Sequence, residues 1–551
     1  MKRIANSLLL IGLLFVVTPS KFLVAQDNAA PKPILHRAAA FDVSQPLDSL
    51  NKLSKPLTYN FHTPEVPRTP ARPSQRSGLV VDPVEQKFAG APVSATIGIN
   101  VLGVTNVDQT GPPDQNLAVG DTQVVEWINS SYAVFDKSTG ALIAGPFEGN
   151  SLWAGFNGAC GTYPYPTRDI IVIWDKIHHR WLFNHDTGVP PYYYCIAVSQ
   201  TADATGAYYR YQYNAPLGVE LPDYVKWGFW TDAYYQSQIN FHGNLVTGSY
   251  PCAYNSAKLL VGDPSAEQIC FQLASGDFGL LPADIDSSTP PPANQDEFFI
   301  GGYLQGSGNA LYLYSMHPDF ADPNQSTITG YNQSQPITVA EFNSPCNGIL
   351  GTDPCVPELN GELLDSIGDR LMYRFAYFDD PVASHVVPNV GSLPRQRWFV
   401  SHSVQASGGQ TGMRWYEFVA PQRRVVPTAL AVYQQGTYAP DSNWRWMGSI
   451  ARDKAGDILM GYSLSGPTIY PTVAFTGRTP SDPLGTMEGE QIIYAGTGVQ
   501  VNLYGVWGDY SSVQLDYADG CTFWYVNEYY AVTGMYTFDT RLASIKFNGC
   551  H

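Results

Sequence analysis

Leu515-Asp516-Tyr517-Ala518-Asp519-Gly520 is one of five similar segments in this chain, each with strand-forming residues and an acidic residue near a turn. The other four are Ile173-Trp174-Asp175-Lys176, Trp230-Thr231-Asp232-Ala233-Tyr234-Tyr235, Gly368-Asp369-Arg370-Leu371-Met372-Tyr373 and Ala451-Arg452-Asp453-Lys454-Ala455-Gly456-Asp457. Fainter copies lie at 118–121 and 298–314. Repetition of this kind in a strand-rich chain is typical of a β-propeller, because each blade is one four-stranded unit.

The sequence around these copies predicts an all-β fold. Short β-type runs bounded by Gly, Pro, Asn and Asp dominate, and helical signals are few. A blade needs roughly 40 to 50 residues, so residues 95–551 accommodate a single β-propeller of seven blades with their loops. Six longer blades or eight shorter ones remain open. The alternating strand at 542–547 is expected to pair with the strand near 97–101 and close the ring.

The sequence before residue 95 divides into two predicted segments. Lys2 and Arg3 precede an apolar run at 8–17, and Leu23-Val24-Ala25 offers a small-residue cleavage site, which is typical of a secretory signal peptide over 1–25. Residues 26–94 are rich in Pro and lack apolar periodicity, which predicts a disordered linker or pro-segment. No later stretch is apolar enough to span a membrane, so we expect a secreted protein, extracellular or periplasmic, without membrane insertion.

The eight cysteines fit an oxidising compartment. Sequence alone cannot fix their connectivity. We favour local pairs, because each pair would then fall within one blade or one loop: Cys160 with Cys195, Cys252 with Cys270, Cys346 with Cys355, and Cys521 with Cys550.

The formal net charge of −17 restricts the partners. A strongly acidic chain is a poor match for nucleic acid phosphates and for anionic membranes. We expect instead a glycan or an extracellular protein as partner, a monomeric chain, and no cofactor.

Residues 116–550 resemble a widespread, poorly characterised family of exported bacterial β-propellers, which is broadly similar to the sialidase-like, Asp-box propellers. The resemblance implies a secreted propeller and brings no catalytic residues with it. It is carried by the segments at 134–140, 195–199, 205–211, 222–228, 368–373, 434–438, 444–450, 505–511 and 521–525.

Two segments are close to the Asp-box pattern. Asp516 to Trp524 is the nearer match and Arg452 to Asp457 the weaker one. In such a box the Asp accepts backbone N–H groups and the Gly takes a positive φ, so its role is that of a turn. These segments therefore predict the fold and carry no functional chemistry.

Polar residues at the start of several candidate inner strands are the functional candidates, because inner strands line a propeller's channel and converge on its mouth. Two carboxylates, or a Tyr beside a carboxylate, are what glycosidic chemistry uses, and arginines clamp acidic sugars. The catalytic candidates are Asp169, Asp223, Asp369, Asp509, Tyr510 and Glu528. The ligand-binding candidates are Arg168, Arg370, Arg445, Trp444 and Trp446.

Two functions follow from these candidates. The first is an exported, non-enzymatic scaffold that presents one face to a glycan or protein; the alternative is a glycan-active hydrolase or lyase at the channel mouth. Close, buried carboxylates in an open pocket would favour the enzyme, and aspartates each matched by an Arg or a backbone donor would favour the scaffold. Whether the protein is an enzyme stays undecided at this point. No metal-ligand set is predicted, because His178, His179 and His185 read as a turn and Asp284 and Asp286 lack a complete calcium loop.

Overall fold

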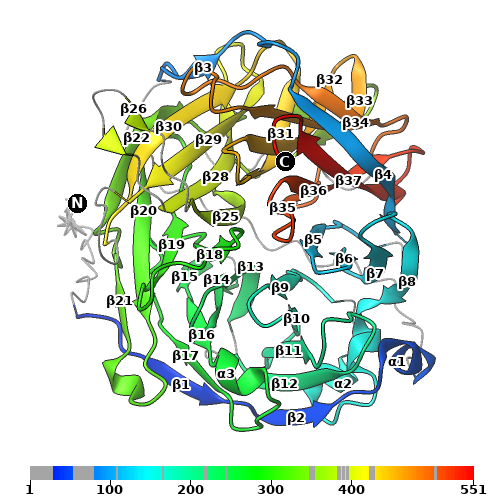
Figure 1. The fold of residues 1–551 in the computed structure, drawn as a ribbon, viewed down its shortest axis with the longest axis vertical. Coiled ribbons are helices and arrows are strands. Elements are labelled where there is room, and N and C mark those ends of the chain that lie inside the picture. Colours follow the sequence, from blue (N-terminus) through cyan, green and yellow to red (C-terminus); the bar gives the residue numbers. More distant parts are fainter. Residues whose placement is uncertain are drawn as a thin grey trace, which may run out of the picture. The chain divides into compact units, whose positions relative to one another are not determined.

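Antiparallel strands make up most of the computed structural model (Figure 1). It describes residues 29–53, 80–106, 110–163, 167–215, 218, 220–243, 245–346, 354–380, 386–387, 391–392, 396–420, 428–501 and 505–551. Residues 31–551 form one compact unit.

The strands fall into sets that follow one another along the chain, and the strands of a set pair antiparallel. The first three sets are β5 (Asn116–Val119), β6 (Gln123–Trp127), β7 (Ser131–Asp136) and β8 (Leu142–Glu148); β9 (Ile173–Asp175), β10 (Arg180–Asp186), β11 (Tyr193–Ser199) and β12 (Tyr208–Asn214); and β13 (Leu221–Phe229), β14 (Tyr234–His242), β15 (Leu245–Ser249), β16 (Cys252–Tyr254) and β17 (Glu267–Cys270).

Four further sets follow along the chain. The first of them is joined to the second, because β18 pairs parallel with β25. They are β18 (Leu281–Ile285), β19 (Glu297–Gly301), β20 (Ser307–His317), β21 (Thr327–Thr329) and β22 (Pro336–Asn343); β25 (Met372–Asp379), β28 (Gln396–Gln405), β29 (Thr411–Val419) and β30 (Ala431–Tyr438); β31 (Trp444–Arg452), β32 (Ile458–Gly466), β33 (Ile469–Arg478) and β34 (Gln491–Ala495); and β35 (Ser512–Leu515), β36 (Thr522–Tyr530) and β37 (Phe538–Phe547).

The remaining elements are mostly short, apart from β4. They are the strands β1 (Ile34–Arg37), β2 (Ala40–Val43), β3 (Glu85–Gln86), β4 (Ala95–Thr105), β23 (Val356–Pro357), β24 (Leu363–Leu364), β26 (Val386–Val387) and β27 (Gly391–Ser392), and the helical turns α1 (Leu47–Leu53), η1 (Gly149–Trp153), α2 (Ala159–Thr162), α3 (Ser256–Leu259) and η2 (Pro323–Gln325). None of the helices in the described ranges is long and apolar enough to cross a membrane.

The first strands of the sets contact one another in a closed circle. β5 contacts β9, β9 contacts β13, and the series continues through β18, β25, β31 and β35 back to β5. Figure 1 shows these strands around the centre, with the remaining strands of each set farther out. Radial repetition of antiparallel sheets about a centre is the arrangement of a β-propeller, so the fold is all-β and propeller-like.

The sheet that ends the chain is completed by an early strand. β37 pairs with β4, with Leu542 opposite Val101 and Ile545 opposite Ile97. Figure 1 shows β4 in blue beside β37 in red. The predicted closing pair is therefore confirmed, and it covers the outer edge that β37 would otherwise expose.

The prediction of a disordered segment over 26–94 is wrong for the described strands within it. β1 pairs with β17, β2 with β12, and β3 with β30, each as an added outer strand. Asp42 of β2 also forms an ion pair with Arg210 at 2.7 Å. Addition to a sheet edge uses main-chain hydrogen bonds, which need no apolar periodicity, so the sequence pattern gives no sign of it.

Aromatic rings fill the spaces between neighbouring sheets. Trp127 stacks on Tyr132 at 4.1 Å between ring centroids and meets Phe183 of the next sheet edge-on at 5.2 Å. Trp398 of β28 likewise contacts Phe298 of the preceding set at 5.6 Å. Much of the chain's aromatic content therefore packs the core.

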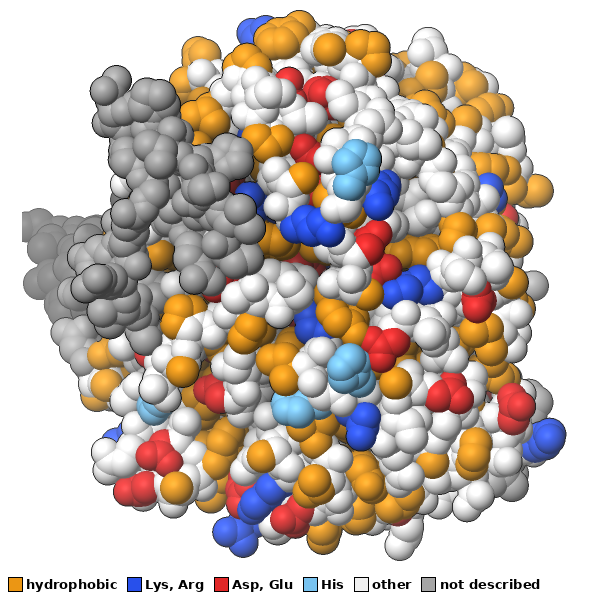
Figure 2. Space-filling view, in the orientation of Figure 1, with side chains coloured by type: hydrophobic (Ala, Val, Ile, Leu, Met, Phe, Trp, Pro, Cys, Tyr) orange, Lys and Arg blue, Asp and Glu red, His pale blue; other side chains and the backbone are white. Residues whose placement is uncertain are grey.

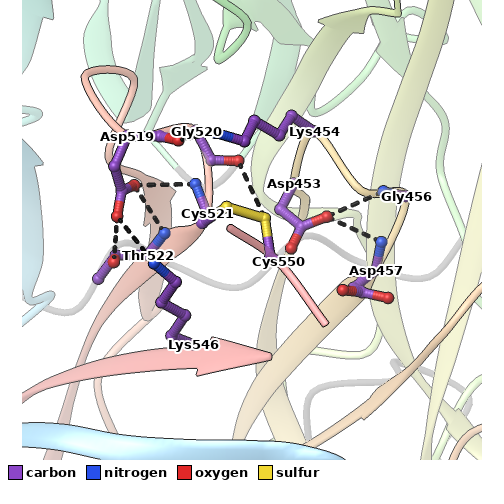
Figure 3. Close-up of a disulfide and its surroundings, with 10 residues drawn as sticks. All are labelled: Asp453, Lys454, Gly456, Asp457, Asp519, Gly520, Cys521, Thr522, Lys546 and Cys550. Atoms are coloured by element: carbon purple, nitrogen blue, oxygen red, sulfur yellow. Dashed lines mark hydrogen bonds and ion pairs between the residues drawn. A yellow bond between two sulfur atoms is a disulfide. The ribbon is translucent and has the colours of Figure 1, made fainter. Parts of the chain in front are cut away.

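Four disulfides join the eight cysteines in the pairs that the local-pair prediction gives. Disulfides are typical of proteins that fold in oxidising compartments, so the four bonds indicate an extracellular or secreted protein. The bond between Cys521 and Cys550 lies beside a turn in which Asp519 accepts the backbone N–H groups of Cys521 and Thr522 (Figure 3).

The neighbouring turn in Figure 3 is built in the same way. Asp453 accepts the N–H groups of Gly456 and Asp457 at 2.9 Å each. Gly456 and Gly520 have φ values of +96° and +65°. Both Asp-box-like segments are therefore turns, as predicted.

Candidate functional site

Most of the predicted polar residues converge at the centre of the circle. Arg168 and Asp169 lie in the segment that leads into β9, Asp223 lies in β13, and Asp509 precedes β35. Arg168 donates to Asp223 at 3.2 Å, so residues that precede or lie in neighbouring inner strands meet.

Three carboxylates form the core of the site. Oxygens of Asp114, Asp169 and Asp509 all lie within 4.8 Å of one another. Asp114 and Asp169 are buried, with 5% and 6% of their surface exposed, while Asp509 is half-buried. The cluster therefore reaches solvent through Asp509.

Asn129 contacts the carboxylate of Asp114 and the backbone of Asp169. Its Nδ2 donates to Asp114 Oδ2 at 2.6 Å, and its Oδ1 accepts the backbone N–H of Asp169 at 2.8 Å. The backbone N–H of Asp509 donates to Asp114 Oδ1 at 2.6 Å. These bonds hold the three aspartates close together although their charges repel.

The proximity and burial of the carboxylates disfavour their charged forms. Burial, followed by the charge of Asp169, raises the pKa of Asp114 to about 7. Burial, followed by the charges of Asp114 and Asp169, raises the pKa of Asp509 well above its usual range. Both shifts favour the protonated forms of Asp114 and Asp509.

Two arginines pair with carboxylates in and beside this core. Arg168 lies 3.5 Å from Asp169, 3.6 Å from Asp186 and 3.2 Å from Asp223. Arg370 makes a two-pronged contact with Asp369, at 2.7 and 3.1 Å. Both guanidinium groups are therefore engaged within the protein.

Lys226 is a buried cation at the same centre. Its Nζ lies 3.6 Å from the ring centroid of Tyr224 and 3.9 Å from that of Tyr510, and it donates to the carbonyl of Val225 at 3.1 Å. Burial lowers the pKa of Lys226 to about 8, against the charges of nearby aspartates, of which Asp169 acts most strongly.

Two further candidates border the carboxylates. The Tyr510 hydroxyl is buried and has no hydrogen-bond partner among the described residues. Burial and the charges of Asp169, Asp114 and Asp509 raise the pKa of Tyr510. Glu528 Oε1 accepts the N–H of Gly508 at 2.7 Å.

Three ligand-binding candidates lie apart from this group. Among the described residues, the ion pairs of Arg445 are with Asp441 at 2.9 Å and Glu490 at 2.8 Å. Trp446 is fully buried and packs edge-on against Trp507 at 5.8 Å, and Trp444 packs against the same apolar cluster. The prediction that these residues join the channel mouth does not match their contacts.

Backbone geometry explains the mismatch. Asp114, Asp169, Tyr224 and Met447 each have a positive φ, between 47° and 51°, near the start of an inner strand. The position in β31 that matches Asp169 is therefore Met447, an apolar residue two places beyond Arg445. Aligning the strands by their polar pairs misplaces this sheet by two residues.

Sequence reasoning missed Asp114 and Lys226. Asp114 follows Gly111-Pro112-Pro113 and precedes β5 as Asp169 precedes β9, but the faint repeat was placed at 118–121 instead. Lys226 is a single charge within the otherwise apolar run 224–229, which is the signal that could have identified it.

Figure 2 shows the face of the molecule seen in Figure 1. Acidic, basic and hydrophobic side chains are interspersed over its coloured part. The coloured part of this face therefore carries no broad patch of a single charge that could attract a ligand.

The sequence matches no protein-family model and no curated protein. The chain is similar to Drosophila Plexin A in complex with Semaphorin 1b, at 9% identity over 84% of this chain and 89% of that one, with a TM-score of 0.30. It is similar to Hadza microbial sialidase Hz136, at 9% identity over 79% and 75%, with a TM-score of 0.33. It is also similar to the extracellular domains 1-2 of Drosophila Semaphorin 1a, at 8% identity over 86% and 89%, with a TM-score of 0.31. Likeness at this level supports no inference about function.

Proposed function

We propose that the protein is an exported, seven-bladed β-propeller that binds a glycan at the mouth of its central channel without turning it over. The blade count is supported by the closed circle of β5, β9, β13, β18, β25, β31 and β35. Each of these strands begins one antiparallel set, once the sheet that runs through β18 and β25 is divided at their parallel pair.

Export is supported by the four disulfides. The proposed signal peptide, residues 1–25, lies outside the described residues. The propeller proper is proposed to include the described strands β1, β2 and β3, since each is paired to one of its sheets.

The observation that carries the binding site is the group of three carboxylates whose oxygens lie within 4.8 Å. Carboxylates accept hydrogen bonds from sugar hydroxyls, and the Tyr510 hydroxyl is a donor that no described residue uses. Asp509, the half-buried member, is the one that a ligand would reach first.

A non-acidic glycan fits this site better than an acidic one. Arg168 and Arg370 are each held by aspartates, and Arg445 is held by Asp441 and Glu490. No arginine of this set is therefore left to clamp a sugar carboxylate, which is what an acidic sugar would need. The same pairing favours a scaffold over a sialidase-like enzyme.

Glycoside hydrolysis is the second candidate, and one observation favours it. Retaining glycosidases place two carboxyl groups about 5 Å apart. The oxygens of Asp114, Asp169 and Asp509 meet that spacing, because they lie within 4.8 Å.

A glycan array with the mature protein tests both candidates. Asp509→Asn removes one carboxyl group from the site, and Asp48→Asn removes a carboxyl group from an exposed position in α1. We expect the protein to bind a neutral glycan, Asp509→Asn to lose that binding at least tenfold, and Asp48→Asn to retain it.

Incubation with the bound glycan then separates the candidates. Release of a shorter sugar by the wild-type protein, and not by Asp509→Asn, would establish the hydrolase. Binding without product supports the scaffold. An array without any bound glycan, or with equal binding by Asp509→Asn, would overturn the proposed site and direct the search to a protein partner.

A further inference from the structure

We infer that Asp114, Asp169 and Asp509 bind a hard divalent cation at the channel mouth, and that Ca²⁺ fits this site best. The inference does not depend on the glycan, because the cation can be bound and measured without it.

The donor set and its spacing suit such an ion. All three side chains offer carboxylate oxygens, which hard cations prefer. Oxygens in one Ca²⁺ sphere lie about 2.3 to 2.6 Å from the ion, so the most distant pair is separated by about 5 Å. The oxygens of these aspartates lie within 4.8 Å of one another and can therefore share one sphere.

The charges around the cluster leave a place for a cation. Among the described residues, Arg168 forms ion pairs with Asp169, Asp186 and Asp223, and Arg370 forms one with Asp369. These pairs leave Asp114 and Asp509 with no ion pair to a side chain in the described ranges. A buried negative group without a cation is unfavourable, and a bound ion would relieve it.

Lys226 does not fill that place. Its single hydrogen bond within the described chain goes to the Val225 carbonyl, and its ammonium stands over the rings of Tyr224 and Tyr510. It forms no ion pair with the described aspartates, so its charge balances the site only from a distance.

The Tyr510 hydroxyl is a second, independent sign of a ligand. It is fully buried and no described residue hydrogen-bonds to it. Tyr510 directly follows Asp509 in the chain, and its ring centroid lies 3.9 Å from the Nζ of Lys226, the buried cation at the same centre. A buried hydroxyl of this kind is costly unless it meets a partner, such as a water or an oxygen in the coordination sphere of an ion.

The test is calorimetric titration of the metal-free mature protein with Ca²⁺, and separately with Mg²⁺. We expect one Ca²⁺ per chain, bound at least tenfold more tightly than Mg²⁺, and a Tm that rises with Ca²⁺ concentration. Asp509→Asn should weaken Ca²⁺ binding at least tenfold, whereas Asp48→Asn should leave it unchanged.

Tyr510→Phe keeps the test decisive if Asp509→Asn fails to fold. Without Ca²⁺ this variant should be as stable as wild type or more so, because it removes a buried hydroxyl without a partner. It should nevertheless bind Ca²⁺ several-fold more weakly.

Two results would overturn the inference: no binding of either ion at millimolar concentration, or unchanged Ca²⁺ binding in both site variants. Tighter binding of Mg²⁺ than of Ca²⁺ would overturn the choice of ion. A failed glycan array would leave these results unaffected, so the two proposals can fail separately.

Discussion

A left-handed backbone position recurs at the start of the inner strands, and what occupies it decides what the channel mouth contains. Asp114 and Asp169 hold two of these positions, and Tyr224 and Met447 hold two others. Aspartate tolerates this conformation better than most residues, because its short side chain bonds locally. The conformation therefore suits aspartate at positions 114 and 169, but it does not decide which residue occupies the other two positions.

Glu126 of β6 is a buried carboxylate away from this site. Both its oxygens accept the N–H of Val104 at 3.1 Å, and Thr540 donates to Oε1. It thus links β6 to the closing strands β4 and β37. Burial raises the pKa of Glu126 to about 7 from its ordinary 4.5, so the folded protein holds a proton here that the unfolded chain releases.

The sign of the resulting pH dependence follows from that shift. Below pH about 4.5 the carboxyl is protonated in both states, and between about 4.5 and 7 the unfolded state ionises first, so stability falls as pH rises. Glu126→Gln removes this loss. We expect the variant to gain about 3 kcal/mol over wild type at pH 8 and little at pH 4, measured by urea unfolding at each pH. An equal difference at both pH values would contradict the assignment.

At the scale of elements, the segment 31–53 belongs to the folded unit. β1 and β2 each extend a sheet, and Leu47 and Leu50 of α1 are 1% exposed within an apolar cluster that includes Trp153. The helix therefore helps, together with the two strands, to hold this segment against the rest of the folded unit.

Leu50→Ala tests that anchoring. Truncating a buried leucine removes apolar contacts and leaves a cavity, so we expect the free energy of unfolding to fall by about 2 to 5 kcal/mol. Ser49→Ala, at an exposed neighbouring position, should change it by less than about 0.5 kcal/mol. Denaturant unfolding of both variants supplies the comparison, and equal stabilities would mean that the helix is not part of the core.

Whether the sequence predicts an element depends on whether its contacts are made by side chains or by the main chain. Local features were predictable. The Asp519 and Asp453 turns follow from their residue types, and the four disulfides match the local pairs that were favoured because each falls within one blade or one loop. β1, β2 and β3 were not, because added edge strands bond through the main chain. Asp114 and Lys226 were missed because a side chain reaches the channel mouth only from certain positions along its strand. The residue types alone do not show which positions these are.

At the scale of the whole molecule, ring closure depends on one strand pair, β4 with β37. A chain that begins at residue 80 retains β4 and loses β1, β2 and α1. A chain that begins at residue 110 also loses β4, and so exposes the edge of β37 with Leu542 beside it. Exposed edges of this kind favour association between chains.

We expect the two shortened chains to behave differently. The chain from residue 80 should unfold cooperatively at a lower Tm, and the chain from residue 110 should elute as aggregates in size-exclusion chromatography. A monodisperse, cooperatively unfolding chain without β4 would show that the ring does not need this closure.

The closing sheet also has a consequence for biosynthesis. A chain made from its N-terminus presents β4 early, but β37, the partner of β4, is synthesised only after the first strands of all seven sets. Until then, β4 lacks its place in a sheet. A product interrupted just before residue 538 contains the whole circle of inner strands but can never pair β4, so it keeps an exposed strand that the complete pairing would cover.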